Sequence, residues 1–178
     1  VSGHIHNKTG TLSMKNCTVT ENTSVAGYSG DIFVESGTVT ATNCILYNNS
    51  GTDNMKQATG SATISYSLYD DGTGGTVTAS TGNITNTDAN PIFMDATTDD
   101  FRISAISPCR EKGTDLSTPT VDINESSRGS GGTNTGSAYD IGCYEQACAS
   151  GTFYVNDNAS TGDIWVSAVG SNSNAGTT

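Results

Sequence analysis

The residues that could do chemistry are few, and the clearest pair is aromatic. Tyr47 and Tyr69 lie in two matching fragments, Leu46-Tyr47-Asn48-Asn49 and Leu68-Tyr69-Asp70-Asp71. If these fragments stack in register as neighbouring strands, the two rings share one strand face and form a small aromatic ladder. Such a ladder could contact a glycan, and ordinary packing of two tyrosines is the alternative.

Two other groups could hold a metal ion. His4 and His6 flank Ile5, so on a strand both imidazoles share one face, but no third ligand lies nearby in the sequence. Acidic residues gather in two later stretches, and calcium takes several oxygen ligands of this kind. A structural calcium ion is therefore one interpretation and simple turn formation the other, with no further cofactor expected. The acidic stretches are Asp95, Asp99 and Asp100, and Asp122 with Asn124.

A polysaccharide-cleaving site would need carboxylates and a basic residue together on one outer face. The three arginines, Arg102, Arg110 and Arg128, all lie in the later part of the chain. Lys8 and Lys15 fall at repeat positions that hold Glu35 and Thr42 in the next copy, so no ladder of basic residues forms. The distribution favours a non-catalytic protein, and we name no catalytic residue.

Composition excludes some partners. The 178 residues carry a formal net charge of −11, which would repel nucleic acid. No apolar run is long enough to span a membrane, so membrane insertion is not expected. Hydrophobic residues make up only 33% of the chain, and its Gly, Thr, Ser and Asn content favours short strands and tight turns over helices.

These residues are positioned by an internal repeat. The fragment Ser2–Cys17 returns 27 residues later as Ser29–Cys44, with Ser, Gly, Ile, Gly, Thr, Asn and Cys coinciding without a gap. Repeats of this kind stack on one another because no single copy can bury its apolar face. We therefore expect Asn16 to lie over Asn43 as an asparagine ladder, and Cys17 over Cys44 as neighbouring buried thiols.

The chain changes character after residue 86. Asp99–Ile103 predicts a turn that leads into a strand, residues 113–138 are polar and loop-like, and Tyr139–Tyr144 predicts a final strand. Residues 147–152 read as a linker, and a new segment begins at 153.

The order of several short motifs in this later part resembles the ending of choice-of-anchor Q bacterial surface proteins. The motifs are Asn90-Pro91-Ile92-Phe93, Asp100-Phe101-Arg102-Ile103, Ser107-Pro108-Cys109, Lys112-Gly113-Thr114, Asp122-Ile123-Asn124 with Arg128, and Tyr139-Asp140-Ile141-Gly142-Cys143-Tyr144-Glu145. The resemblance covers about residues 1–146. Cys109-Arg110-Glu111-Lys112 departs from the family, which has Ala-Ile-Asp-Ala after Ser-Pro.

The resemblance implies an all-β fold, a right-handed parallel β-helix of the pectin-lyase-like type with an irregular, strand-containing C-terminal cap. Residues 1–146 would form the last coils and the cap, 147–152 a linker and 153–178 the start of a following module. The implied function is a non-catalytic structural or adhesive module of an extracellular bacterial surface protein or filament. Its partners would be other modules of the same polypeptide and surface glycans. The alternative is a carbohydrate-active β-helix, either a polysaccharide lyase or a glycan-binding module.

The remaining cysteines fall in the motifs of the implied cap. A bond between Cys109 and Cys143 would close a loop of about 34 residues and contribute about 3–4 kcal/mol in the chain-entropy model. We predict this disulfide, because the family often carries small residues at these positions and the enclosed stretch has little apolar content. Cys109 with Cys148 is the alternative pairing.

Overall fold

The structure is a computed structural model that describes residues 5–23, 32–49, 53–70, 72–74, 78–85, 90–129 and 139–146. All of them belong to the first of the chain's two units, Val1–Cys148. His4, Cys148, the predicted linker 147–152 and the predicted segment 153–178 lie outside these ranges.

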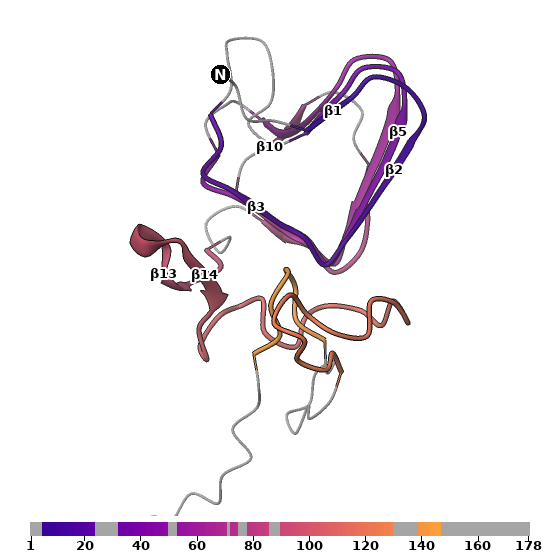
Figure 1. Cartoon of the computed structure of the whole chain (residues 1–178). Coiled ribbons are helices and arrows are strands. Elements are labelled where there is room, and N and C mark those ends of the chain that lie inside the picture. The colour runs from indigo at the N-terminus through magenta and orange to yellow at the C-terminus, as the bar shows by residue number, and fades with distance from the viewer. Residues whose placement is uncertain are drawn as a thin grey trace, which may run out of the picture. The chain divides into compact units, whose positions relative to one another are not determined.

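The protein is all-β, and most of its strands pair in parallel. Three four-stranded sheets have the orders β1-β4-β7-β10, β11-β8-β5-β2 and β12-β9-β6-β3. Successive strands along the chain enter different sheets, so each sheet gathers one strand from every repeat (Figure 1). We call β1–β3 coil one, β4–β6 coil two, β7–β9 coil three and β10–β12 coil four. Their bounds are β1 Ile5–Asn7, β2 Thr11–Lys15, β3 Thr18–Thr20, β4 Ile32–Val34, β5 Thr38–Thr42, β6 Ile45–Tyr47, β7 Asp53–Gln57, β8 Ser61–Ser65, β9 Leu68–Tyr69, β10 Gly72–Gly74, β11 Thr78–Ala79 and β12 Ile84–Thr85.

Coils one and two stack with the predicted spacing of 27 residues. Ile5 pairs with Ile32, Leu12 with Val39 and Val19 with Leu46. The register is continuous along all three strands, so the repeat read from the sequence is confirmed for these coils.

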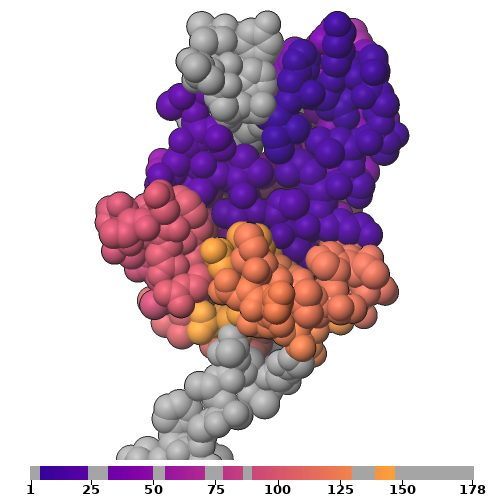
Figure 2. All heavy atoms as spheres, viewed as in Figure 1, coloured from indigo at the N-terminus to yellow at the C-terminus, as the bar shows by residue number. Residues whose placement is uncertain are grey.

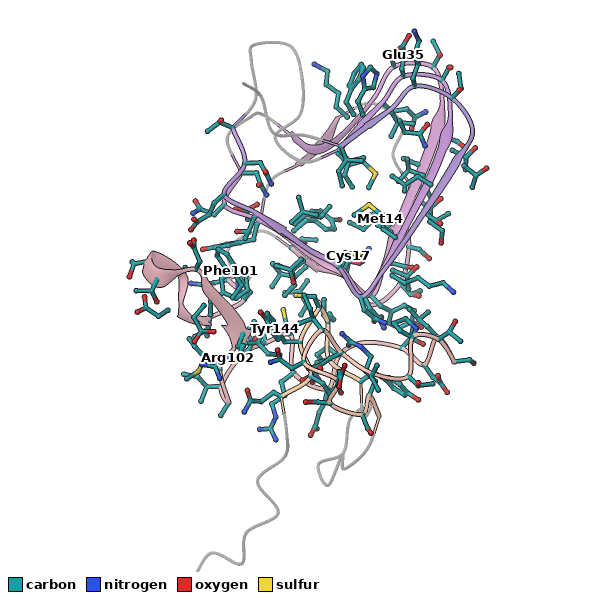
Figure 3. All side chains as sticks on the ribbon, viewed as in Figure 1. Met14, Cys17, Glu35, Phe101, Arg102 and Tyr144 are labelled. Atoms are coloured by element: carbon teal, nitrogen blue, oxygen red, sulfur yellow. The ribbon has the colours of Figure 1, made fainter. Side chains whose placement is uncertain are left out.

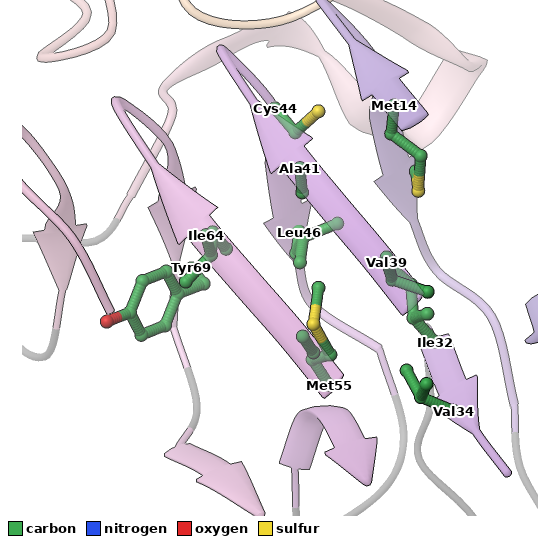
Figure 4. Close-up of a cluster of buried hydrophobic side chains, with 11 residues drawn as sticks. Met14, Ile32, Val34, Val39, Ala41, Cys44, Leu46, Met55, Ile64 and Tyr69 are labelled. Atoms are coloured by element: carbon green, nitrogen blue, oxygen red, sulfur yellow. The ribbon is translucent and has the colours of Figure 1, made fainter. Parts of the chain in front are cut away.

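The strands form because small β-branched and polar residues alternate along them. In β5, Thr38 and Thr40 are exposed while Val39 and Ala41 are buried. The inward side chains of the three sheets meet in one apolar cluster (Figure 4). Its members are Met14, Ile32, Val34, Val39, Ala41, Cys44, Leu46, Met55, Ala62, Ile64 and Tyr69.

The turn between the second and third strand of each coil needs a left-handed residue. Asn16, Asn43 and Tyr66 occupy this position in coils one to three, with φ of 51°, 55° and 46°. Asparagine tolerates this conformation better than most residues do. The turn therefore explains why asparagine stands before both cysteines of the repeat.

The segments 90–129 and 139–146 form what we call the cap. Its regular part is an antiparallel pair, β13 (Phe93–Asp95) and β14 (Asp100–Ile103), joined by the 3₁₀ turn η2 (Ala96–Thr98) and by Asp99, whose φ is 61°. The predicted turn into a strand at 99–103 is thus confirmed. Tyr139–Tyr144 was predicted as a strand and is not one, because its main chain bonds to coil two and to another part of the cap instead of to a strand.

The cap covers the outer face of the third sheet. Figure 2 shows orange cap residues directly against the indigo coils. Ile45 and Leu68 point out of the coils and are fully buried against Ile103, Cys109 and Ile141 of the cap. This sheet is buried on both faces, which explains the unbroken apolar run Cys44-Ile45-Leu46. In the described ranges η2 is the one helix, and no helix there has the length and apolar character to cross a bilayer.

Candidate functional site

The asparagine ladder is the point at which the cap binds the coils. Asn43 Nδ2 donates to Asn16 Oδ1 at 3.0 Å, which confirms the predicted ladder. The same amide accepts from the main-chain N–H of Thr114 at 2.9 Å and donates to the carbonyl of Thr114 at 2.8 Å. Asn43 thus joins coil one, coil two and the cap.

The last part of the cap bonds to the same turn. The N–H of Gly142 donates to the carbonyl of Asn43 at 2.9 Å, and the N–H of Cys143 donates to Thr18 Oγ1 at 3.1 Å. Gly142 has a φ of 107°, and a Cβ there would lie 2.6 Å from Ile45 Cδ1. Only glycine fits this close approach of cap and coil.

A charged cluster lies within the cap, and we define it as Asp122, Arg128, Asp140 and Glu145. Arg128 Nη1 lies 3.1 Å from Glu145 Oε2, and Arg128 Nη2 donates to the carbonyl of Gly142 at 2.9 Å. The two charged side chains are 1% and 8% exposed. Because they are buried, the attraction between the two charges is weakly screened, and the cost of removing both charges from water opposes it.

The other two carboxylates of the cluster accept bonds from the main chain. Asp140 accepts from the N–H groups of Glu111 and Gln146 at 2.7 and 2.5 Å. Asp122 Oδ1 accepts from the N–H groups of two residues in its own loop, and its Oδ2 accepts from the N–H of Glu145 at 2.8 Å. These carboxylates hold loop segments in place, and their oxygens are already occupied by main-chain donors.

Burial makes Glu145 a weaker acid than an exposed glutamate. Desolvation, with the nearby Asp140 charge as a second cause, raises the pKa of Glu145 from 4.5 to about 7, and Arg128 opposes this rise. Burial also raises the pKa of Asp140. The cluster can therefore hold a proton near neutral pH.

The raised pKa of Glu145 predicts that the stability of the fold depends on pH. Between about pH 4.5 and 7 the folded chain binds more protons than the unfolded chain, because the pKa of Glu145 is higher in the fold. The free energy of unfolding should consequently decrease as the pH rises through this window, by on the order of 2 kcal/mol. Urea unfolding at a series of pH values measures it.

A matched pair of variants separates this effect from the general charge of the chain. Glu145→Gln should flatten the profile, whereas Glu125→Gln, at an exposed glutamate of the same cap, should leave it unchanged. A profile that is equally steep in both variants would show that Glu145 is not its source.

The two tyrosines named in the sequence are not brought together. Leu46, and not Tyr47, pairs with Tyr69, because coils two and three are 23 residues apart at their paired positions. A shift of one residue turns a side chain to the opposite face of its strand. Tyr69 is therefore in the inner core, while Tyr47 packs on the outer face with its ring 6.2 Å from that of Phe93. The predicted aromatic ladder is wrong.

Cys109 and Cys143 are free thiols, and the disulfide predicted between them is not formed. Cys109 is fully buried beside Ile141, where desolvation raises its pKa to about 12. Cys143 instead lies over Thr18 of coil one. Cys17 and Cys44 are also free, as expected; Cys44 is fully buried and Cys17 is partly exposed.

The acidic stretches have local partners. Asp95 Oδ1 accepts from the N–H and the hydroxyl of Thr97, and Asp100 binds Arg102 through both carboxylate oxygens at 2.8 and 2.6 Å. Phe101, Arg102 and Tyr144 lie in the same part of the cap (Figure 3). In the ranges that the structure describes, no three acidic, histidine or cysteine side chains are grouped so as to hold a metal ion.

The sequence did not reveal an outward aromatic contact on the first sheet. His6 pairs with Phe33, and their ring centroids lie 5.2 Å apart on the outer face of the sheet. His6 Nε2 lies 2.9 Å from Glu35 Oε2. The repeat offset of 27 residues places His6 over Phe33, so the sequence carries the signal for this contact.

Comparison with known proteins adds no relative. No family model matches the chain, and no curated protein or solved structure matches it either.

Proposed function

We propose that the chain is a non-catalytic structural or adhesive module of an extracellular bacterial surface protein or filament, built on a right-handed parallel β-helix. The observation that carries the proposal is the use of the polar side chains at the turns. Asn43 binds Asn16 and the cap, and Asn49 Oδ1 accepts from the N–H and the amide of Asn22 at 2.7 and 3.0 Å. These groups connect coil to coil, as a structural module requires.

The cap supports the same proposal. Its carboxylates are engaged with main-chain N–H groups and with Arg128, so they fasten loops. The cap also covers the apolar side chains Ile45 and Leu68 on the outer face of the third sheet and so keeps them from water. Its partners would be other modules of the same polypeptide.

Labelling of intact cells of the source organism tests this proposal. Antibodies raised against the chain should label cells that have not been permeabilised. Labelling that appears only after permeabilisation would contradict an extracellular location. Release of unsaturated products from acidic polysaccharides, followed by ultraviolet absorbance, would contradict the non-catalytic role.

Glycan binding is the second candidate, and the contact between His6 and Phe33 favours it. A sugar ring can stack on an outward aromatic face while the neighbouring Glu35 carboxylate accepts from its hydroxyls. On a glycan array, Phe33→Ala should abolish any binding that the chain shows. Tyr47→Ala is the matched control, since Tyr47 packs against Phe93 of the cap. Equal loss in both variants would point to general unfolding.

A further inference from the structure

Cys17 and Cys44 stand side by side in equivalent turns of coils one and two. Cys17 directly precedes Thr18 and Cys44 directly precedes Ile45, and these two strand residues pair with each other. The N–H of Ile45 donates to the carbonyl of Cys17 at 2.8 Å. Neighbouring parallel strands lie about 4.8 Å apart, inside the range of about 4.4–6.8 Å that disulfides span between Cα atoms. The backbone thus places two thiols within bonding reach.

The two thiols differ in access. Cys44 is fully buried in the inner core, between coils one and three. Cys17 is partly exposed. Figure 3 places Cys17 on the inner side of its turn, near Met14. A small reagent can therefore meet Cys17 first.

The pKa of Cys17 also favours its reaction before Cys44. The neighbouring Cys44 side chain is the largest cause that lowers the pKa of Cys17, to about 6. Thiolate is the nucleophilic form of cysteine, so Cys17 is activated at neutral pH. By contrast, burial raises the pKa of Cys109 and of Cys143.

We propose that Cys17 is a redox-sensitive nucleophile that reacts with small-molecule disulfides and passes the oxidation to Cys44, giving a reversible bond between coils one and two. In the first step the Cys17 thiolate attacks one sulfur of the small disulfide, forms a mixed disulfide and releases one thiolate. In the second step the Cys44 sulfur attacks Cys17 Sγ and the second small thiolate leaves. Two protein thiols are oxidised, one small disulfide is reduced, and the protons of the two cysteines end on the released thiols.

The mixed disulfide removes one of the two barriers to the second step. The contact with Cys17 is the largest cause that raises the pKa of Cys44, and desolvation by burial also raises it. Once Cys17 Sγ is covalently bonded it carries no charge, so this cause disappears. A disulfide prefers a Cβ separation of about 3.8 Å, less than the strand spacing, so the turns must close slightly and the bond should be easily reduced.

Peptide mapping of the oxidised protein tests the proposal. The chain is incubated with oxidised glutathione at neutral pH, quenched, alkylated and digested without reductant. We expect a linked Cys17–Cys44 peptide pair that mild dithiothreitol releases, while Cys109 is alkylated only after denaturation. An unmodified Cys17, a lasting mixed disulfide on Cys17 in the wild type, or a bond from Cys17 to another cysteine would each overturn the proposal.

Serine variants separate the two steps. Ser67 already occupies the equivalent position in coil three, where its hydroxyl donates to the carbonyl of Ser65 at 2.7 Å, just as Cys44 Sγ contacts the carbonyl of Thr42 at 3.3 Å. Cys44→Ser should therefore fold and retain glutathione on Cys17. Cys17→Ser should leave Cys44 unmodified, and modification of Cys44 in that variant would contradict the order of the steps.

The pH profile of alkylation provides a readout that does not need a variant. Under native conditions, reaction of Cys17 with iodoacetamide should continue to about pH 6, the value to which its pKa is lowered, whereas an ordinary thiol loses reactivity below about pH 8.5. An ordinary thiol profile at Cys17 would overturn its role as the nucleophile.

Discussion

Replacing Asn43 by alanine is expected to lower the free energy of unfolding by about 3–5 kcal/mol. The Asn43 side chain is fully buried and makes three hydrogen bonds. Its loss leaves the N–H and the carbonyl of the half-buried Thr114 and the amide oxygen of the buried Asn16 without these bonds. Each unsatisfied buried group costs about 1–3 kcal/mol, and alanine at a φ of 55° adds about 1 kcal/mol.

Asn48 gives the matched control for backbone strain. It is an exposed asparagine with a φ of 53° in the next turn of coil two. Asn48→Ala should cost only about 1 kcal/mol, since its side chain is not buried. Urea unfolding of both variants measures the difference. A loss in Asn43→Ala no larger than in Asn48→Ala would mean that the ladder does not hold the cap.

The position of Asn43 shows how far the sequence predicts this fold. Its stacking on Asn16 follows from a repeat of fixed length, because paired strands keep identical residues together. Its bonds to Thr114, which is 71 residues away, left no periodic signal. Repeats thus predict contacts between coils, and they are silent on the irregular cap that binds those coils.

The predicted register of coil three is wrong for a related reason. The fragments Leu46-Tyr47 and Leu68-Tyr69 look alike, yet Ile45 pairs with Leu68. The similarity of the two fragments suggests one pairing, but the turn geometry gives another. Tyr66 takes the left-handed position that Asn43 has in coil two and so fixes the pairing that follows. An alignment anchored on the turn, and not on the tyrosines, predicts the observed register.

The cap was predicted as a unit but not in its interactions. The motif around Asp140 and Glu145 suggested a strand, because apolar and polar residues alternate there. In the structure the apolar Ile141 packs against Cys109, and the acidic residues bind main-chain groups and Arg128. A short alternating pattern is equally compatible with a strand and with a loop that is fastened on both sides.

Removing the charge of Arg128 is the second change with a large expected effect. Measured above about pH 7, where Glu145 is ionised in the fold, Arg128→Met should lower the free energy of unfolding by about 3–5 kcal/mol, because it leaves the buried Glu145 carboxylate without its cation and the carbonyl of Gly142 without its donor. Methionine keeps most of the volume of the arginine stem. The loss therefore reports the charge and its hydrogen bonds rather than a cavity.

Arg102 provides the exposed counterpart. Its pair with Asp100 is bidentate, yet the Arg102 side chain is 54% exposed, so Arg102→Met should change stability much less than Arg128→Met does. Arg128→Met combined with Glu145→Gln should recover part of the stability, because the uncompensated buried charge is then gone. Equal losses in the two arginine variants, or no recovery in the double variant, would contradict the assignment of Arg128 and Glu145 as the pair that holds the cap. Both arginines are paired with a carboxylate in the same cap, so the expected difference comes from the burial of Arg128 and from its added bond to the carbonyl of Gly142.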